Sequence, residues 1–190
     1  MKTDVIIVSS DGDKMEEALT LAEKVALYKG LPARAALQLR LLSEEALGMM
    51  RSITGNRKGK FWIEDMEDVY QLHLQVDTPM DMNKQEQLLS ASTSGKNEAA
   101  KGFMGRIRAF FEPLNWSDAP VITNAEGMDP YVSWSMNSYK KAVEKELNQD
   151  HEGAAEAWDE LEKSVISNIA DEVKVSIKGR TVEMIIFKRF

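Results

Sequence analysis

Residues 60–77 read KFWIEDMEDVYQLHLQVD. In the second half of this stretch apolar side chains alternate with polar ones, Tyr70, Leu72, Leu74 and Val76 against Gln71, His73 and Gln75. Alternation of this kind is typical of a β-strand with one buried face. KFWIED and VYQLHLQVD therefore predict the two strands of an antiparallel hairpin, which turns at Met66, Glu67 and Asp68.

The segments before this hairpin predict one strand and two helices. Residues 4–9 (DVIIVS) are apolar and β-branched, as expected of a strand. Residues 13–28 and 32–53 carry apolar residues at helical spacing, which predicts two consecutive helices.

The segments after the hairpin predict mostly helices and a final hairpin. We expect two short helices at about 81–90 and 103–111. An ordered irregular connection should follow at about 114–134, and then two longer helices at about 136–147 and 152–169. The last strands span about 173–188 and turn at Gly179 and Arg180.

This order of elements predicts an α+β fold. We expect a two-layer α/β sandwich in which helices cover one face of a mixed, largely antiparallel sheet. A length of 190 residues with 43% hydrophobic and 29% charged residues suits one globular domain. The prediction is a single domain over residues 1–190, with an additional loop and two helices at about 113–170.

Composition excludes several classes of function. A net charge of −7 argues against a nucleic-acid partner, because binding to phosphates draws on clustered Lys and Arg. No run approaches the roughly 18 apolar residues of a membrane span. The short apolar run near the N-terminus and the absence of cysteine favour the cytoplasm. The absence of cysteine also excludes thiolate nucleophiles. His73 and His151 are predicted to be ordinary surface residues, so no metal site is expected.

Four places carry residues that can do chemistry. They are Glu44 and Glu45 in LRLLSEEALGMM, Asp77 at a strand end, Gly102 and Gly105 before a helix, and Thr181 after the last turn. Taken singly, each has an ordinary structural explanation: a solvated helix edge, a turn residue, a helix entrance and a hairpin turn.

The stretch SGKNEAAKGFMGRIRAFFE, residues 94–112, contains Gly95 and Lys96 side by side. A P-loop also needs a glycine five residues before this pair and Ser or Thr after it, but Ser90 and Asn97 occupy those positions. The segment is therefore not predicted to be a P-loop.

The order of these four places along the chain resembles the Bergerat-type ATP-binding fold of histidine kinases, heat-shock protein 90, DNA gyrase B and MutL. The segment GLPARAALQLRLLSEEALGMM and the hairpin after it are most similar to the anti-sigma-factor serine kinases. The resemblance covers roughly residues 1–112 and 171–190.

The resemblance implies roles for particular residues and ATP as the ligand. Glu44, or Glu45 in the other register, corresponds to the family's catalytic acidic residue, Asp77 to the residue that binds the adenine amino group, and Thr181 to a threonine near the adenine. The second glycine box falls on Gly102 and Gly105. The ATP lid would contain Ser94, Gly95, Lys96 and Lys101.

The sequence also departs from the family. Gly48, or Met49, replaces the Mg²⁺-binding Asn, and neither supplies an oxygen ligand. Two hypotheses about function follow. In the first, the protein is an ATP-binding regulatory protein, a divergent serine kinase or weak ATPase, that acts with a protein partner or as a homodimer. In the second, it is a non-catalytic interaction module that uses residues 113–170.

Overall fold

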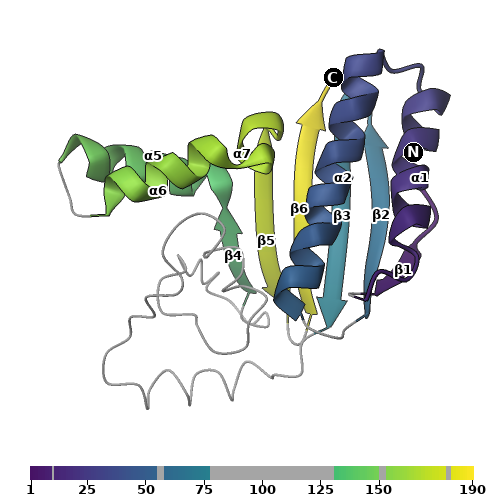
Figure 1. Cartoon of the computed structure of the whole chain (residues 1–190), viewed down its shortest axis with the longest axis horizontal. Coiled ribbons are helices and arrows are strands. Elements are labelled where there is room, and N and C mark those ends of the chain that lie inside the picture. The colour runs from purple at the N-terminus through teal and green to yellow at the C-terminus, as the bar shows by residue number, and fades with distance from the viewer. Residues whose placement is uncertain (10, 55–57, 78–130, 150–152, 179–180) are drawn as a thin grey trace.

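The computed structural model describes residues 1–9, 11–54, 58–77, 131–149, 153–178 and 181–190 (Figure 1). Within these ranges one antiparallel sheet has the strand order β1-β2-β3-β6-β5-β4. The strands are β1 (Ile6–Ser9), β2 (Lys58–Met66), β3 (Val69–Asp77), β4 (Tyr131–Ser135), β5 (Glu172–Lys178) and β6 (Thr181–Arg189). The helices are α1 (Met15–Tyr28), α2 (Ala33–Thr54), α5 (Met136–Asn148), α6 (Ala154–Lys163) and α7 (Val165–Ile169).

The central hairpin forms as the alternating sequence predicts. β2 and β3 pair from Gly59 with Val76 to Met66 with Val69. Glu67 in the turn has a φ of 60°, a left-handed conformation that a non-glycine residue adopts mainly in tight turns. On its other side β3 pairs with β6, and this pairing joins the middle of the chain to its C-terminal strand.

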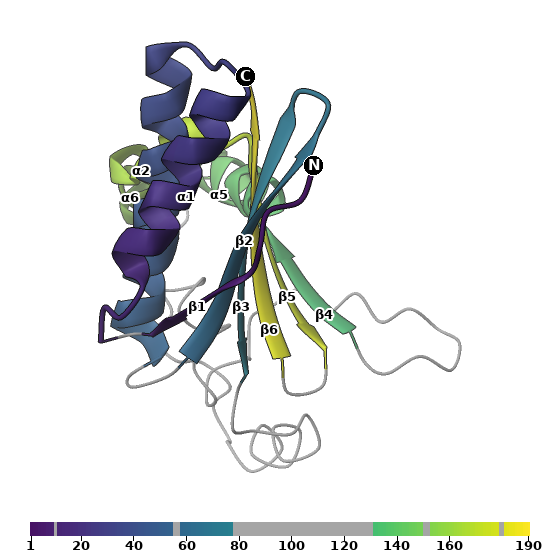
Figure 2. The same ribbon diagram turned by 90° about the vertical axis from the view of Figure 1, so that its right-hand side faces the viewer.

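The helices lie on one face of the sheet, which confirms the predicted two-layer α+β sandwich. Figure 2 shows α1 and α2 side by side against one face. No helix of the described residues covers the other face, which is called the open face. α7 contacts α2 on the same side, and α5 and α6 extend past β4 at the far edge of the sheet (Figure 1). Every strand pairing among the described residues is antiparallel, so no parallel pair of the expected mixed sheet is present there.

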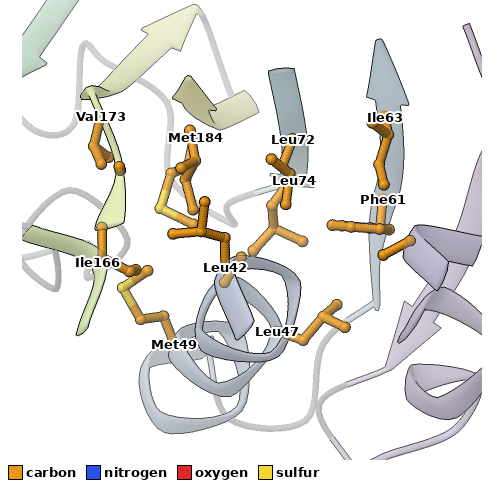
Figure 3. Packing of buried hydrophobic residues seen from close by; sticks show 14 of the residues in the cluster. Leu42, Leu47, Met49, Phe61, Ile63, Leu72, Leu74, Ile166, Val173 and Met184 are labelled. Atoms are coloured by element: carbon orange, nitrogen blue, oxygen red, sulfur yellow. The ribbon is translucent and has the colours of Figure 1, made fainter. Parts of the chain in front are cut away.

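The core lies between α2 and the sheet (Figure 3). Leu42 and Leu47 of α2 face Phe61 and Leu74, and all four side chains are almost fully buried. On the sheet side the same layer contains Ile63, Leu72, Val173 and Met184. Leu72 and Leu74 belong to the alternating apolar set that predicted one buried face of β3.

A buried ion pair joins α1 to the central hairpin. Asp65 lies on the helix-covered face of β2 with only 1% of its side chain exposed, and Lys29 at the end of α1 contacts its Oδ2 atom. This contact raises the pKa of Lys29, mainly through the hydrogen bond to Asp65. Without Lys29, the ion-pair partner left to this buried carboxylate among the described residues would be the N-terminal ammonium of Met1, 3.7 Å from the same oxygen. Weakening a buried pair in this way is more costly than losing an exposed one.

Two segments differ from the sequence prediction. Residues 131–134 were expected to be irregular, but β4 begins at Tyr131 because pairing with β5 satisfies its backbone and Trp134 is buried opposite Val175. The helix expected over 152–169 is interrupted at Ser164, which is extended (ψ 123°) and whose hydroxyl accepts from the Ser167 N–H at 3.2 Å. Ser164 thus caps a separate short helix. The helices expected at 81–90 and 103–111 lie outside the described residues.

Two matched substitutions should test which face of α2 is buried. Leu39 is completely buried and Leu37, two residues earlier on the same helix, is 56% exposed. Leu39→Ala should lower the free energy of unfolding by about 2–5 kcal/mol, because it removes buried methyl groups and leaves a cavity. Leu37→Ala makes the same change in helix propensity and should stay within about 0.5 kcal/mol of the unaltered protein. Urea unfolding measures both, and equal effects would contradict this placement of α2.

Candidate functional site

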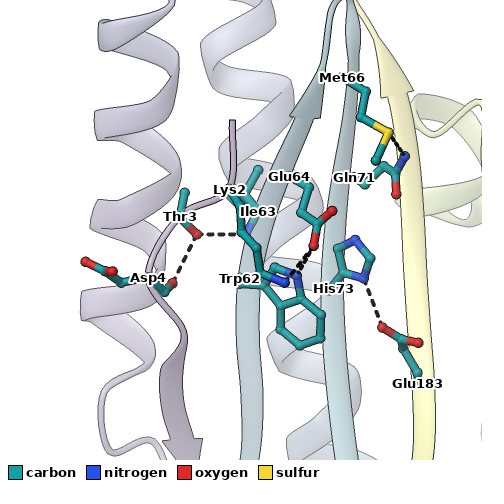
Figure 4. Close-up of polar contacts among 10 residues, drawn as sticks. All are labelled: Lys2, Thr3, Asp4, Trp62, Ile63, Glu64, Met66, Gln71, His73 and Glu183. Atoms are coloured by element: carbon teal, nitrogen blue, oxygen red, sulfur yellow. Dashed lines mark hydrogen bonds and ion pairs between the residues drawn. The ribbon is translucent and has the colours of Figure 1, made fainter.

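The open face of the sheet carries an aromatic and polar cluster (Figure 4). The rings of Trp62 and His73, paired across β2 and β3, stack with centroids 4.6 Å apart and planes inclined by 10°. His73 Nδ1 lies 3.0 Å from Glu183 Oε1 on β6, and His73 Nε2 has no partner among the described residues. His73 is only 6% exposed, so the prediction that it is a surface residue is wrong. Stacking on Trp62 buries the ring even though its strand position faces away from the helices.

Glu64 extends this cluster toward the N-terminus. Its Oε1 accepts a hydrogen bond from Trp62 Nε1 at 2.8 Å and lies 2.9 Å from Lys2 Nζ (Figure 4). The same ammonium lies 4.9 Å from the centroid of a Trp62 ring, within the range of a cation–π contact. The hydrogen bond from Lys2, followed by that from Trp62, lowers the pKa of Glu64.

Asp77 and Thr181 come together at the end of the sheet. They are paired residues at the ends of β3 and β6, and Thr181 Oγ1 donates to Asp77 Oδ1 at 3.1 Å. The second carboxylate oxygen of Asp77 has no hydrogen-bond partner among the described residues, and Asp77 is exposed. The bond thus orients a carboxylate that still has an accepting oxygen in solvent.

A small pocket of about 100 Å³ opens beside Asp77. Its lining consists of Ile7, Lys58, Gly59, Lys60, Gln75 and Asp77. Apolar surface from β1, two ammonium groups from β2 and a carboxylate from β3 therefore meet at one corner of the open face. A ligand group at this corner can contact apolar surface and charged side chains at the same time.

The acidic residues of α2 lie elsewhere. Glu44 is exposed and Glu45 half-buried on the helix layer, whereas strand alternation directs Asp77 and Thr181 to the opposite face. The sheet therefore lies between the two sets, and the structure does not bring them together. Gly48, one turn after Glu44, is also exposed and has no atom within 4 Å of an added Cβ.

The remaining predicted site residues lie outside the described residues. They are Ser94, Gly95, Lys96, Lys101, Gly102 and Gly105. The described part of the chain contains no group of three or more His, Asp or Glu side chains arranged to hold a metal ion. Its helices include none that is long and apolar enough to cross a membrane.

No local pattern in the sequence indicates the contacts between Trp62, His73 and Glu183. Trp62 and His73 are separated by the hairpin, and Glu183 follows His73 by 110 residues. Only the register of three strands places them in contact. A polar residue at every second position of β3 was the available clue, but it is equally typical of a solvated face.

A scan against protein-family models found no match to the chain, and a search of curated proteins found none either.

We expect the contacts of Glu64 to make the free energy of unfolding depend on pH. Because the folded-state pKa of Glu64 lies below its ordinary value of 4.5, the carboxylate stabilises the fold above pH 4.5 and loses this effect as the pH falls through the folded-state pKa. Glu64→Gln should lower the free energy of unfolding near pH 7 by at most about 1 kcal/mol, because the pair is solvent-screened. The difference between the two proteins should shrink below pH 4.5.

Urea unfolding at several pH values between 3 and 7 measures this difference. The same substitution in a Lys2→Met background is the control, because it lacks the main cause of the shifted pKa. A difference that stays constant over the whole pH range would show that the charge of Glu64 does not act in this way.

Proposed function

We propose that this protein is a nucleotide-binding regulatory protein in which Asp77 recognises the exocyclic amino group of an adenine base. The observation that supports this proposal is the hydrogen bond between Thr181 and Asp77. The resemblance to Bergerat-type proteins assigns both residues to adenine recognition, although 104 positions separate them in the sequence. Their contact is what a shared role in one site requires.

The surroundings of Asp77 suit a nucleotide better than an uncharged ligand. One carboxylate oxygen is held by Thr181, which leaves the other to accept from an amino group. Lys58 and Lys60 line the adjacent pocket and can meet phosphate oxygens as point charges. A pocket of about 100 Å³ is smaller than the roughly 300–1,000 Å³ typical of ligand sites, so it holds one group of the nucleotide rather than all of it.

The proposal concerns binding and does not include phosphoryl transfer. Glu44 and Glu45 lie across the sheet from Asp77, and Gly48 stands where the resemblance requires an Asn for Mg²⁺. Phosphoryl transfer depends mainly on a positioned metal and on electrostatic stabilisation of the phosphates. A serine kinase or ATPase activity therefore has less support than nucleotide-dependent regulation of a protein partner.

A second candidate function, an interaction module that binds no nucleotide, is favoured by a different observation. Val5 is 46% and Ile7 is 45% exposed at the edge of the open face, and Ile185 and Phe187 are half-buried within it. The module was expected to use residues 113–170, but Trp134 of that segment is buried and Trp158 packs against the core. Trp116 lies outside the described residues. The open face is thus the better partner surface.

Nucleotide titration separates the two candidates. ATP or ADP at 100 times its dissociation constant should stabilise the protein by about 2.7 kcal/mol. For a chain of this length, such an effect raises Tm by about 5–10 °C. Asp77→Asn should weaken binding at least about tenfold, because a hydrogen bond to a charged group contributes about 1.5–3 kcal/mol. Thermal unfolding with and without Mg²⁺ measures both effects.

Asp159→Asn is the matched control, because Asp159 is an exposed carboxylate on α6, which extends past β4 at the far edge of the sheet. Thr181→Ser should retain binding and Thr181→Val should reduce it, since only serine preserves the hydroxyl that orients Asp77. No change of Tm with any nucleotide would reject the binding role. Binding that Mg²⁺ does not alter would retain it and exclude a metal-dependent kinase.

A further inference from the structure

A second and larger hollow lies on the open face, at the opposite end of the strands from Asp77. It has a volume of about 580 Å³, within the range of about 300–1,000 Å³ of small-molecule sites. The described residues that line it are Val69, Asp171, Glu172, Lys174, Phe187 and Arg189. Neither the Bergerat resemblance nor the proposed nucleotide site uses any of them.

Phe187 of β6 supplies the aromatic ring that lines this hollow. It pairs with Glu172 of β5 on one side and with Gln71 of β3 on the other. Arg189, two residues further along β6, projects from the same face and pairs with Val69. An aromatic ring, a valine and a guanidinium group thus lie next to one another.

The carboxylate of Asp171 is already paired within the protein. Its Oδ1 lies 3.1 Å from Lys188 Nζ, and its Oδ2 accepts from the Arg189 backbone N–H at 2.6 Å. Both oxygens are therefore occupied, and the ammonium of Lys188 balances the charge.

Glu172 is also fully engaged. Its Oε1 accepts from the backbone N–H groups of Val173 at 2.9 Å and Asn137 at 3.2 Å, and its Oε2 accepts from the Ser135 hydroxyl at 3.1 Å. Ser135 and Asn137 belong to the start of α5, where the helix dipole favours a negative charge. The carboxylate therefore serves to cap α5.

Lys174 and Arg189 supply the two cations of the hollow. Among the residues that the structure describes, neither Lys174 Nζ nor the Arg189 guanidinium takes part in an ion pair. Lys174 Nζ lies 5.3 Å from the centroid of the Phe187 ring, so its charge is held above the aromatic surface. With both carboxylates engaged, the hollow presents two positive groups that have no ion-pair partner among the described residues, beside an apolar floor.

We propose that this hollow binds a small aromatic carboxylate. The carboxylate of the ligand lies between Lys174 and Arg189, where the guanidinium can donate two parallel hydrogen bonds. The ring of the ligand lies on the apolar surface of Phe187 and Val69. Binding needs no covalent step and is independent of Asp77.

Phenylacetate is a suitable probe, and three analogues isolate its two features. Phenylacetamide keeps the ring and lacks the charge, phenethylamine reverses the charge, and acetate lacks the ring. We expect phenylacetate to bind with a dissociation constant on the order of a millimolar, typical of so small a ligand. Saturable changes in the backbone amide NMR signals of Lys174, Phe187 and Arg189 would locate it. The three analogues should bind at least about threefold more weakly.

Lys174→Gln and Arg189→Gln should each weaken phenylacetate about three- to fivefold, because exposed charge pairs contribute up to about 1 kcal/mol. Lys141→Gln, which removes an exposed cation on α5, should leave the affinity unchanged, and so should Asp77→Asn. Because Lys174 and Arg189 are exposed, both variants should fold. The proposal is rejected if phenylacetate causes no saturable shift at these residues up to tens of millimolar. Equal affinity for phenylacetamide, or affinity unaffected by both substitutions, also rejects it.

Discussion

The pairing of β3 with β6 is the constraint on which the rest of the structure depends. It runs from Val69 opposite Arg189 to Asp77 opposite Thr181 and places the C-terminal strand beside the central hairpin. On the helix-covered face it brings Leu74 against Met184, so that α2 packs on a continuous apolar layer. On the other face it brings Glu183 within reach of His73. A slip of one residue would exchange these two faces and expose the core.

The sequence predicts the elements better than their arrangement. Alternation in residues 69–77 and helical periodicity in residues 13–53 are local signals, and they located β3, α1 and α2 to within about two residues. The burial of His73 was missed because it depends on Trp62 and Glu183, which reach it only through strand register. For the candidate site, resemblance suggested Asp77 and Thr181, but no local pattern could show that Glu44 lies on the opposite face of the sheet.

The two faces of the sheet differ in how their charged side chains are paired. Among the described strand residues the helix-covered face carries one carboxylate, Asp65, which pairs with Lys29 at the end of α1 and with the N-terminal ammonium of Met1. On the open face each carboxylate near an aromatic ring has a donor: Glu64 has Trp62 and Lys2, and Glu183 has His73. Anionic side chains there are mostly satisfied within the protein, whereas Lys174 and Arg189 are left with unused donors among the described residues. An acidic protein can therefore present local sites for anions.

The end of the sheet near Asp77 also constrains how the chain can vary in length. β3 ends at Asp77, and β4 begins at Tyr131, which connects to Asp77 through the cross-strand pairs with Lys178 and Thr181. Three strand spacings separate these two points, about 14 Å. Any change in the length of the chain between residues 78 and 130 must therefore keep its two ends at this separation, because the strand pairings on either side fix where they lie.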